Sequence, residues 1–183
     1  MIDVNFHKPV MLEEIKTFIP FAKKINVVDA TFGGGGYSRT LLEEYNVNQL
    51  IAIDRDPISK IFAKDLSERF KNFKIINGCF SNIDELIRSN CNIKNSKFDI
   101  IIFDLGLSSN QINDPKRGFS FMKEGPLDMD MGGSKIRASD IINNFSERKL
   151  ADIFFELGEE RYSKRIARKD RKSTRLNSSH SEI

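Results

Sequence analysis

Two features of the sequence have the residue types and the spacing of a nucleoside-binding site. Four consecutive glycines, Gly33–Gly36, directly follow the apolar run Ile25–Phe32, and a second apolar run, Leu50–Ile53, ends at Asp54. Glycine lets the backbone turn tightly and approach a ligand without interference from a Cβ atom. An acid at the end of the next strand can accept hydrogen bonds from both ribose hydroxyls. The pattern therefore predicts a strand, a glycine turn, a helix and a second strand that together bind a nucleoside.

The glycine turn by itself does not distinguish between two cofactors. The segment Gly33–Ser38 nearly matches the dinucleotide pattern GxGxxG but has Ser38 in the sixth place, and the 21 residues from Gly33 to Asp54 suit NAD and S-adenosylmethionine equally. A helix-capping turn without a ligand is a further alternative. Asp29 favours S-adenosylmethionine, because a carboxylate there would repel a pyrophosphate and can face the amino and sulfonium groups. Asp29 can also be hydrogen-bonded to loop amides, and both roles can hold together.

A third segment, Asp104–Gln111, follows the apolar run Ile100–Phe103 and contains an acid, small residues and an amide. Open α/β sheets keep their reactive groups at the carboxyl ends of the strands. Asp104 can accept a hydrogen bond from a substrate amino group or from the methionine of the cofactor, and a strand-end cap is the alternative. This segment favours S-adenosylmethionine over NAD.

Strand and helix patterns alternate around these residues, which predicts a parallel α/β sheet with right-handed crossovers. The last strand has an almost continuous apolar sequence, typical of a strand buried on both faces. The expected strands are Ile25–Thr31, Leu50–Asp54, Phe73–Ile76 and Phe98–Leu105. The expected helices are Pro9–Ile19, Tyr37–Tyr45, Pro57 to about Phe70, and one that begins with a capping box of Ser81 and Asp84.

The pattern changes after Ser108. A polar stretch without clear periodicity runs to about Arg137, and helices are expected at Ser139–Phe145, Ser146–Leu157 and Glu159–Arg168. The final residues, from Lys172 onward, have neither periodicity nor an apolar face and resemble translated vector DNA. We therefore leave them out of the prediction of the fold, with an authentic disordered tail as the alternative.

Composition and charge exclude several classes of protein. With 183 residues, 39% hydrophobic and 30% charged, the chain suits an ordinary globular domain. It has neither an apolar stretch of about 18 residues that could span a bilayer nor the pattern of a signal peptide. Cys79 and Cys91 are not spaced as a metal or redox pair, so we expect two reduced thiols, no metal and a cytoplasmic location.

The net charge of +3 arises from one short segment. Eight Lys and Arg residues lie between Arg161 and Arg175 against the single Asp170, whereas residues 1–160 carry a net charge of −3. A nucleic-acid partner therefore cannot be argued from global charge, and any basic surface must be local.

Seven segments follow one another as they do in a known family. The chain resembles the family of ribosomal RNA small subunit methyltransferase H, also called MraW, over residues 7 to about 168. The segments are His7–Val10, Asp29–Ser38, Ala52–Pro57, Asp104–Gln111, Arg117–Met122, Gly125–Met129 and Gly158–Arg161.

The resemblance implies a Rossmann-like, S-adenosylmethionine-dependent methyltransferase sheet, present here with its N-terminal strands only. Residues 1–108 are expected to be the N-terminal part of the cofactor-binding domain, and residues 109–168 the beginning of an inserted helical domain that recognises the substrate. Residues 169–183 are expected to be a non-native tail. Because members of the family are much longer, the chain resembles a C-terminally truncated member, and we expect this polypeptide alone to be unstable or inactive.

By the same resemblance, the family's cofactor-binding residues can be placed on this chain. Asp54 binds the ribose and Phe80 flanks the adenine, with ordinary core packing as the alternative for Phe80. Many relatives carry His at Tyr37 and Arg at Asp130. The residues expected to bind S-adenosylmethionine are Gly35, Gly36, Tyr37, Asp54, Phe80, Asp104 and Gln111.

The family transfers a methyl group to N4 of a cytidine in bacterial 16S rRNA, so the resemblance implies the small ribosomal subunit as partner and leaves a homodimer open. Asp104 is the candidate catalytic residue, and the chemistry needs no metal. Arg117, Phe119 and Phe121 are candidates for contact with the base, with a buried edge as the alternative, and His7 is a weaker candidate near the site. The basic run from Arg161 is either an RNA-phosphate contact or a solvated helix face. Two other functions stay open: an NAD-dependent oxidoreductase and a non-catalytic RNA-binding or inert fragment.

Overall fold

The computed structural model describes residues 9–90, 97–134 and 136–178, without the side chains of 171–178. The chain forms two compact units. The first contains residues up to Asn113 together with Met131–Gly133, and the second contains Asp114–Asp130 and the residues from Ser134 onward. The expected domain boundary lay at residues 108 and 109. His7 and Cys91 lie outside the described residues.

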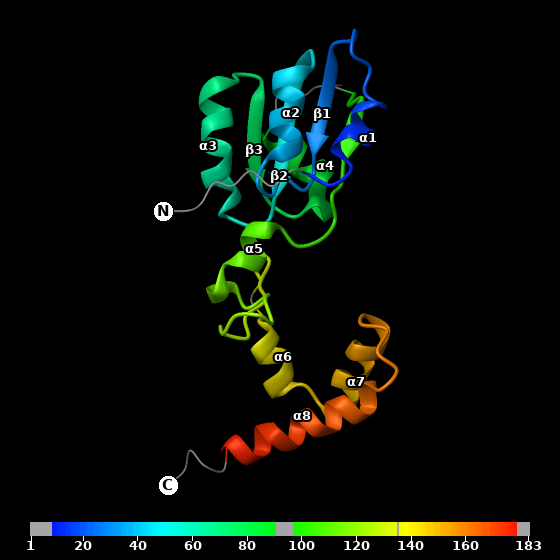
Figure 1. Ribbon diagram of the computed structural model, residues 1–183, viewed down its shortest axis with the longest axis vertical. Coiled ribbons are helices and arrows are strands. Elements are labelled where there is room, and N and C mark those ends of the chain that lie inside the picture. Colours follow the sequence, from blue (N-terminus) through cyan, green and yellow to red (C-terminus); the bar gives the residue numbers. More distant parts are fainter. Residues whose placement is uncertain (1–8, 91–96, 135, 179–183) are drawn as a thin grey trace. The chain divides into compact units, whose positions relative to one another are not determined.

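The first unit is built on a four-stranded parallel sheet (Figure 1). The order of strands is β3-β2-β1-β4, and each neighbouring pair is parallel, which confirms the prediction of an α/β fold. Because all four strands run the same way, their carboxyl ends lie at one edge of the sheet. The strands are β1 Ile25–Asp29, β2 Val47–Asp54, β3 Phe73–Asn77 and β4 Ile100–Ile102.

Helices cover the sheet unequally on its two faces. Alternate residues of a strand point to opposite faces. Val27 and Leu50 pack with helices α1 (Leu12–Lys16), α2 (Gly36–Glu44) and α3 (Ser59–Arg69). Val28 and Ile51 pack on the opposite face with α4 (Ile83–Asn90).

The prediction that the fourth strand is buried on both faces was wrong. Ile102 is buried, but Ile101 is 51% exposed and Phe103 is 49% exposed. Ile101 pairs with Val28, so it belongs to the face that α4 covers over the other strands. Among the described strands β4 pairs with β1 alone, and α4 packs on residues of β1, β2 and β3. The apolar run is therefore an edge strand with one face uncovered.

Two local predictions in the first unit were also wrong. The first helix is shorter than expected, because Met11 has a left-handed backbone (φ 52°) and Thr17 ends the helix with its amide and hydroxyl both bonded to the carbonyl of Glu14. Ser81 does not cap α4. It lies inside the 3₁₀ turn η1 (Phe80–Asn82), and its hydroxyl contacts the Asn82 side chain at 3.4 Å.

The second unit is helical and has a small core of Leu150, Ala151 and Ala167. The hydroxyl of Ser146 caps helix α7 (Glu147–Glu156) by accepting a hydrogen bond from the Lys149 amide at 3.3 Å. A search of the described residues for a helix with the length and hydropathy of a membrane span found none. The remaining elements are α5 Ser109–Asn113 in the first unit and η2 Pro115–Arg117, α6 Ala138–Asn144, α7 Glu147–Glu156 and α8 Ser163–Ser178 in the second.

The last helix continues past the predicted end at Arg168 to Ser178. No Gly or Pro lies between these residues, so nothing in the backbone stops the helix there. The foreign origin of the tail stays a prediction.

Candidate functional site

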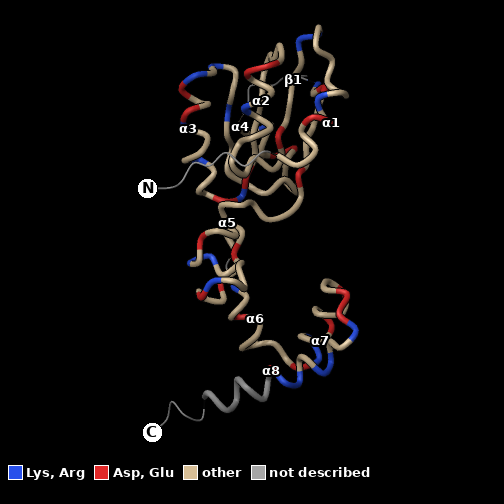
Figure 2. The backbone as a smooth tube through the Cα atoms, viewed as in Figure 1, with Lys and Arg blue, Asp and Glu red and all other residues tan. Residues whose placement is uncertain are grey.

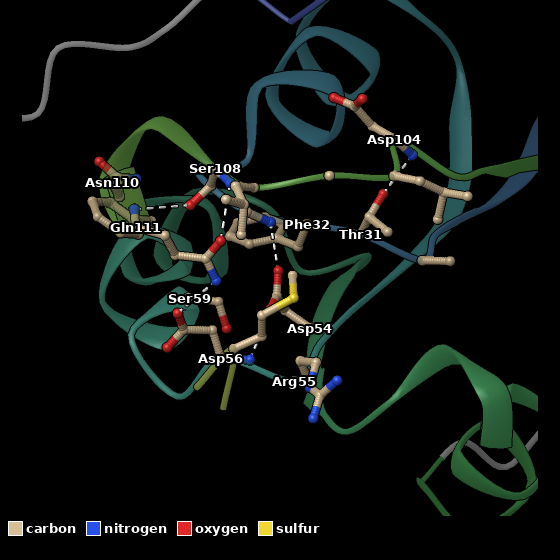
Figure 3. A pocket seen from close by; sticks show the side chains of 18 of the residues that line it. Thr31, Phe32, Asp54, Arg55, Asp56, Ser59, Asp104, Ser108, Asn110 and Gln111 are labelled. Carbon is tan, nitrogen blue, oxygen red and sulfur yellow. Dashed lines mark hydrogen bonds between the residues drawn. The ribbon is translucent and has the colours of Figure 1, made fainter. Parts of the chain in front are cut away.

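A cavity of about 620 Å³ opens at the carboxyl edge of the sheet. Its size falls in the range of small-molecule and cofactor sites. Segments that follow all four strands line it, so residues far apart in sequence meet there (Figure 3). Six of the seven predicted cofactor-binding residues line this cavity, namely Gly36, Tyr37, Asp54, Phe80, Asp104 and Gln111.

The seventh, Gly35, lies in the glycine turn but is not among the residues that line the cavity. Its φ is +80°, and a Cβ atom there would lie 2.6 Å from the ring of Phe32. Glycine is therefore required at this position by the turn and by the neighbouring ring. Gly33 and Gly34, which belong to the predicted glycine turn but were not among the residues that the resemblance assigned to cofactor binding, line the cavity.

Asp54, at the end of β2, holds the turn through its carboxylate. It accepts hydrogen bonds from the Gly33 amide at 2.6 Å and from the Asp56 amide at 2.8 Å. Burial raises the pKa of Asp54, and the two amide hydrogen bonds oppose that effect. A carboxylate has about four acceptor positions, so this group can also accept hydrogen bonds from a ligand in the cavity.

Asp29, at the end of β1, is completely buried. Its carboxylate accepts hydrogen bonds from the Ser38 hydroxyl in α2 at 2.6 Å and from the Thr31 amide at 3.3 Å, and the second of these confirms the predicted bonding to a loop amide. Burial raises the pKa of Asp29 to about 6, although both hydrogen bonds act to lower it. Asp29 is not among the residues that line the cavity, and its role toward a methionine group stays a prediction.

The raised pKa of Asp29 makes stability depend on pH. In the unfolded chain this carboxyl ionises near its usual pKa of about 3.9, so its ionisation costs the fold stability as the pH rises from about 4 to above 6. With a pKa of about 6 in the folded chain, the loss is about 3 kcal/mol. Asp29→Asn is expected to remove this loss, because the amide stays neutral. We expect its free energy of unfolding, measured by urea denaturation, to fall less between pH 5 and pH 8 than that of the wild type.

The exposed residue Asp84 on α4 provides the control for that experiment. Asp84→Asn should keep the pH dependence of the wild type. If Asp29→Asn showed the pH dependence of the wild type, Asp29 would not be the group that lowers stability as the pH rises.

The two predicted aromatic residues are fixed by contacts within the protein. The Tyr37 hydroxyl donates a hydrogen bond to the carbonyl of Val10, so the ring ties α2 to the segment before α1. Burial, and then the charges of Asp104 and Asp29, raise the pKa of Tyr37, which keeps the phenol protonated as a donor. Phe80 is half-exposed and meets the ring of Phe103 edge-on at 5.5 Å. Its exposure argues against ordinary core packing.

Asp104 follows β4 and is exposed at the cavity. Its backbone amide donates a hydrogen bond to the Thr31 hydroxyl at 2.7 Å (Figure 3). This hydrogen bond joins the segment after β4 to the segment after β1, and Thr31 thereby positions Asp104. Among the described residues the Asp104 carboxylate has no hydrogen-bond partner, so it is available to accept one from a ligand.

Gln111 uses its side-chain amide to join two loops. Its Oε1 accepts a hydrogen bond from the Ser108 amide at 3.0 Å, and its Nε2 donates to Asp56 at 3.0 Å. Gln111 and Asp56 are both buried. The pair therefore holds the segment after β4 against the segment after β2, and any contact of Gln111 with a cofactor stays a prediction.

Met131 also lines the cavity, and it was not predicted from the sequence. Arg55 donates a hydrogen bond from Nε to the carbonyl of Gly132 at 3.2 Å, and a Cβ atom on Gly132 would lie 2.4 Å from the carbonyl oxygen of Arg55. Only glycine allows this close approach. The two consecutive glycines, Gly132 and Gly133, were the only local sign of a close backbone contact here. The sequence does not indicate that the contact is with Arg55, which lies 77 residues before Gly132.

In the second unit, the candidate base-contacting residues have different environments. Phe121 is 96% exposed, which excludes a buried edge for this ring. Arg117 lies 5.8 Å from the ring centroid of Phe119 and donates a hydrogen bond to the carbonyl of Asp130 at 2.7 Å.

Within the described residues, no cluster of three or more His, Cys, Asp or Glu side chains is arranged to hold a metal ion.

Comparison with known proteins identifies the family. The sequence model of the MraW methylase family matches residues 4–180, beyond the predicted end of the resemblance near Arg168. A protein of Hyphomonas neptunium named ribosomal RNA small subunit methyltransferase H is 43% identical over 162 residues, which are 88% of this chain and 46% of that protein. A protein of Rickettsia bellii with the same name is 40% identical over 176 residues, 94% of this chain and 55% of its own length. This chain thus spans about half the length of these curated relatives, and it belongs to the MraW methylase family.

Proposed function

We propose that this protein transfers a methyl group from S-adenosylmethionine to N4 of a cytidine in the 16S rRNA of the bacterial small ribosomal subunit. The observation that carries the proposal is the single cavity in which the glycine turn, Asp54 and Asp104 meet. The names of the relatives support a small-subunit rRNA methyltransferase. Family membership argues against the NAD-dependent oxidoreductase.

The residues around the cavity suit an adenosine linked to an amino acid. Backbone groups of Gly33, Gly34 and Gly36 can approach the methionine part closely. Asp54 can accept hydrogen bonds from the ribose hydroxyls. The half-exposed ring of Phe80 can lie against the adenine.

S-adenosylmethionine carries its methyl group on a sulfonium, already activated for transfer. The protein's task is then to hold the acceptor nitrogen in line with that group. The lone pair of cytosine N4 is delocalised into the ring, so a hydrogen-bond acceptor beside the amino group raises its electron density. We assign this role to the carboxylate of Asp104, which also receives the proton that N4 loses. The target base must be unpaired or rotated out of its stack to reach the site.

The second unit supplies candidate contacts for RNA. Phe121 presents an exposed ring on which a base can stack. Arg161, two residues before α8, and Lys164 and Arg165, in its first turn, are exposed. Figure 2 shows basic residues along this part of the chain. We propose that these side chains bind phosphates of the substrate.

Replacing Arg161 and Arg165 together by glutamine is expected to weaken binding of a 16S rRNA fragment. Each phosphate contact to single-stranded RNA contributes about 0.7 to the slope of log K against log salt, so losing two should reduce that slope by about 1.4. Fluorescence anisotropy at several salt concentrations measures it. Lys64→Gln, at an exposed position on α3, is the matched control and should leave the slope unchanged. An unchanged slope in the double variant would show that this helix face is only solvated.

The transfer reaction is tested in a chimera, because the chain spans about half the length of its relatives. Residues 1–168 are joined to the corresponding C-terminal part of the Rickettsia bellii protein. Small subunits that lack the modification are incubated with the chimera and methyl-labelled S-adenosylmethionine, and the digested RNA is examined by mass spectrometry. We expect labelled N4-methylcytidine. Label on another nucleoside, or none from a chimera that binds S-adenosylhomocysteine, would refute the proposal.

A further inference from the structure

Ser59, the first residue of α3, has a buried hydroxyl that is not hydrogen-bonded. The residue is 1% exposed and lines the cavity. Among the described residues its Oγ has no hydrogen-bond partner. Buried polar groups in folded proteins are almost always paired, so each exception needs an explanation.

The position of Ser59 in the helix explains why the protein itself does not satisfy this hydroxyl. A serine inside a helix can donate to the carbonyl four residues earlier, as Ser67 does to Ala63 at 2.9 Å. For Ser59 the corresponding carbonyl belongs to Arg55, before the helix begins. That carbonyl instead accepts a hydrogen bond from Asn77 at 3.2 Å.

The nearby carboxylates already have donors. The oxygens of Asp56 accept hydrogen bonds from Gln111 and from the Ile58 amide, and those of Asp54 accept from Gly33 and Asp56. Figure 3 shows Ser59 together with Asp54 and Asp56 among the residues around the cavity. None of these hydrogen bonds comes from Ser59, whose hydroxyl lies among the residues that line the cavity together with Asp54.

We propose that Ser59 is a cofactor-binding residue whose hydroxyl forms a hydrogen bond with the nucleoside part of S-adenosylmethionine. The inference rests on the proposed function, since it assigns a further residue to the same site. The nucleoside part is indicated because Ser59 comes five residues after Asp54, the last residue of β2, whereas Asp104 lies after β4. A ligand atom beside Oγ supplies the partner that the free protein lacks.

The test compares two ligands on the full chain by isothermal titration calorimetry. S-adenosylhomocysteine contains the nucleoside and the amino acid, and 5′-methylthioadenosine contains the nucleoside without the amino acid. Ser59→Ala is expected to weaken both ligands by about 3- to 10-fold, the effect of losing one neutral hydrogen bond. Without ligand, the variant should unfold at the same temperature as the wild type or higher, because it removes an unsatisfied buried group.

Ser67→Ala, on the same helix, is the control and should leave both dissociation constants unchanged. Ser59→Cys keeps the size of the side chain and should reproduce the loss of affinity if Ser59→Ala fails to fold. Unchanged affinity in the Ser59 variants overturns the inference while leaving the proposed function intact. A loss for S-adenosylhomocysteine alone overturns the assignment to the nucleoside. A wild-type chain that unfolds cooperatively and binds neither ligand refutes the proposed function itself.

Discussion

Asp54→Asn is expected to weaken binding of S-adenosylhomocysteine to this chain by at least about 100-fold. The carboxylate accepts hydrogen bonds from the Gly33 amide at 2.6 Å and from the Asp56 amide at 2.8 Å. In our proposal it also accepts hydrogen bonds from the ribose hydroxyls. An asparagine replaces one acceptor oxygen by an NH₂ group that must face a donor. Losing two hydrogen bonds to a charged group costs about 3 kcal/mol or more, which corresponds to a factor above 100.

Isothermal titration calorimetry of the purified chain measures this loss. Asp84→Asn, which changes an exposed carboxylate on α4, should bind the ligand as the wild type does. An affinity for Asp54→Asn within tenfold of the wild type would show that the ligand does not use this carboxylate.

The second large effect is expected in the chemical step. In the chimera, Asp104→Asn should lower the rate constant of methyl transfer by about 10²- to 10⁴-fold, the usual contribution of a positioned proton acceptor. Affinity for S-adenosylhomocysteine should change by only a few fold. The backbone amide of residue 104, and not its carboxylate, makes the hydrogen bond to Thr31, so the substitution keeps this contact at the site. Single-turnover transfer to small subunits, together with calorimetry, separates the two effects.

Asp104 has an alternative role as an acceptor for the methionine part of the cofactor. In that case Asp104→Asn would lose affinity by a large factor and keep its rate constant at saturating cofactor. That outcome would move Asp104 from catalysis to binding. Asp84→Asn in the same chimera should match the unsubstituted chimera in both measurements.

The parts of the site that depend on local sequence were predictable. Glycines followed by a helix predict a turn, and an acid at the end of an apolar run predicts a carboxylate at the sheet edge. Asp54 and the glycine turn therefore meet as expected, with a hydrogen bond between Gly33 and Asp54. The parallel sheet followed from the same alternation of strands and helices.

The errors arose where one residue's environment depends on distant parts of the chain. The apolar run of β4 carries no information on how many helices cover it, and Ile101 is half-exposed in consequence. The side-chain amide of Gln111 donates a hydrogen bond to Asp56, 55 residues earlier, a contact that the local sequence does not indicate. Met131 lines the cavity next to Gly132, which lies against the backbone of the distant residue Arg55. None of these contacts has a periodic signal in the sequence.

The central claim is that the cavity at the edge of the sheet binds S-adenosylmethionine. It is tested most directly by the melting temperature of the full chain with increasing S-adenosylhomocysteine or NAD. A ligand that binds only the folded state raises the melting temperature with its concentration. We expect S-adenosylhomocysteine to raise it progressively and NAD to leave it unchanged. Stabilisation by NAD and not by S-adenosylhomocysteine would contradict the account.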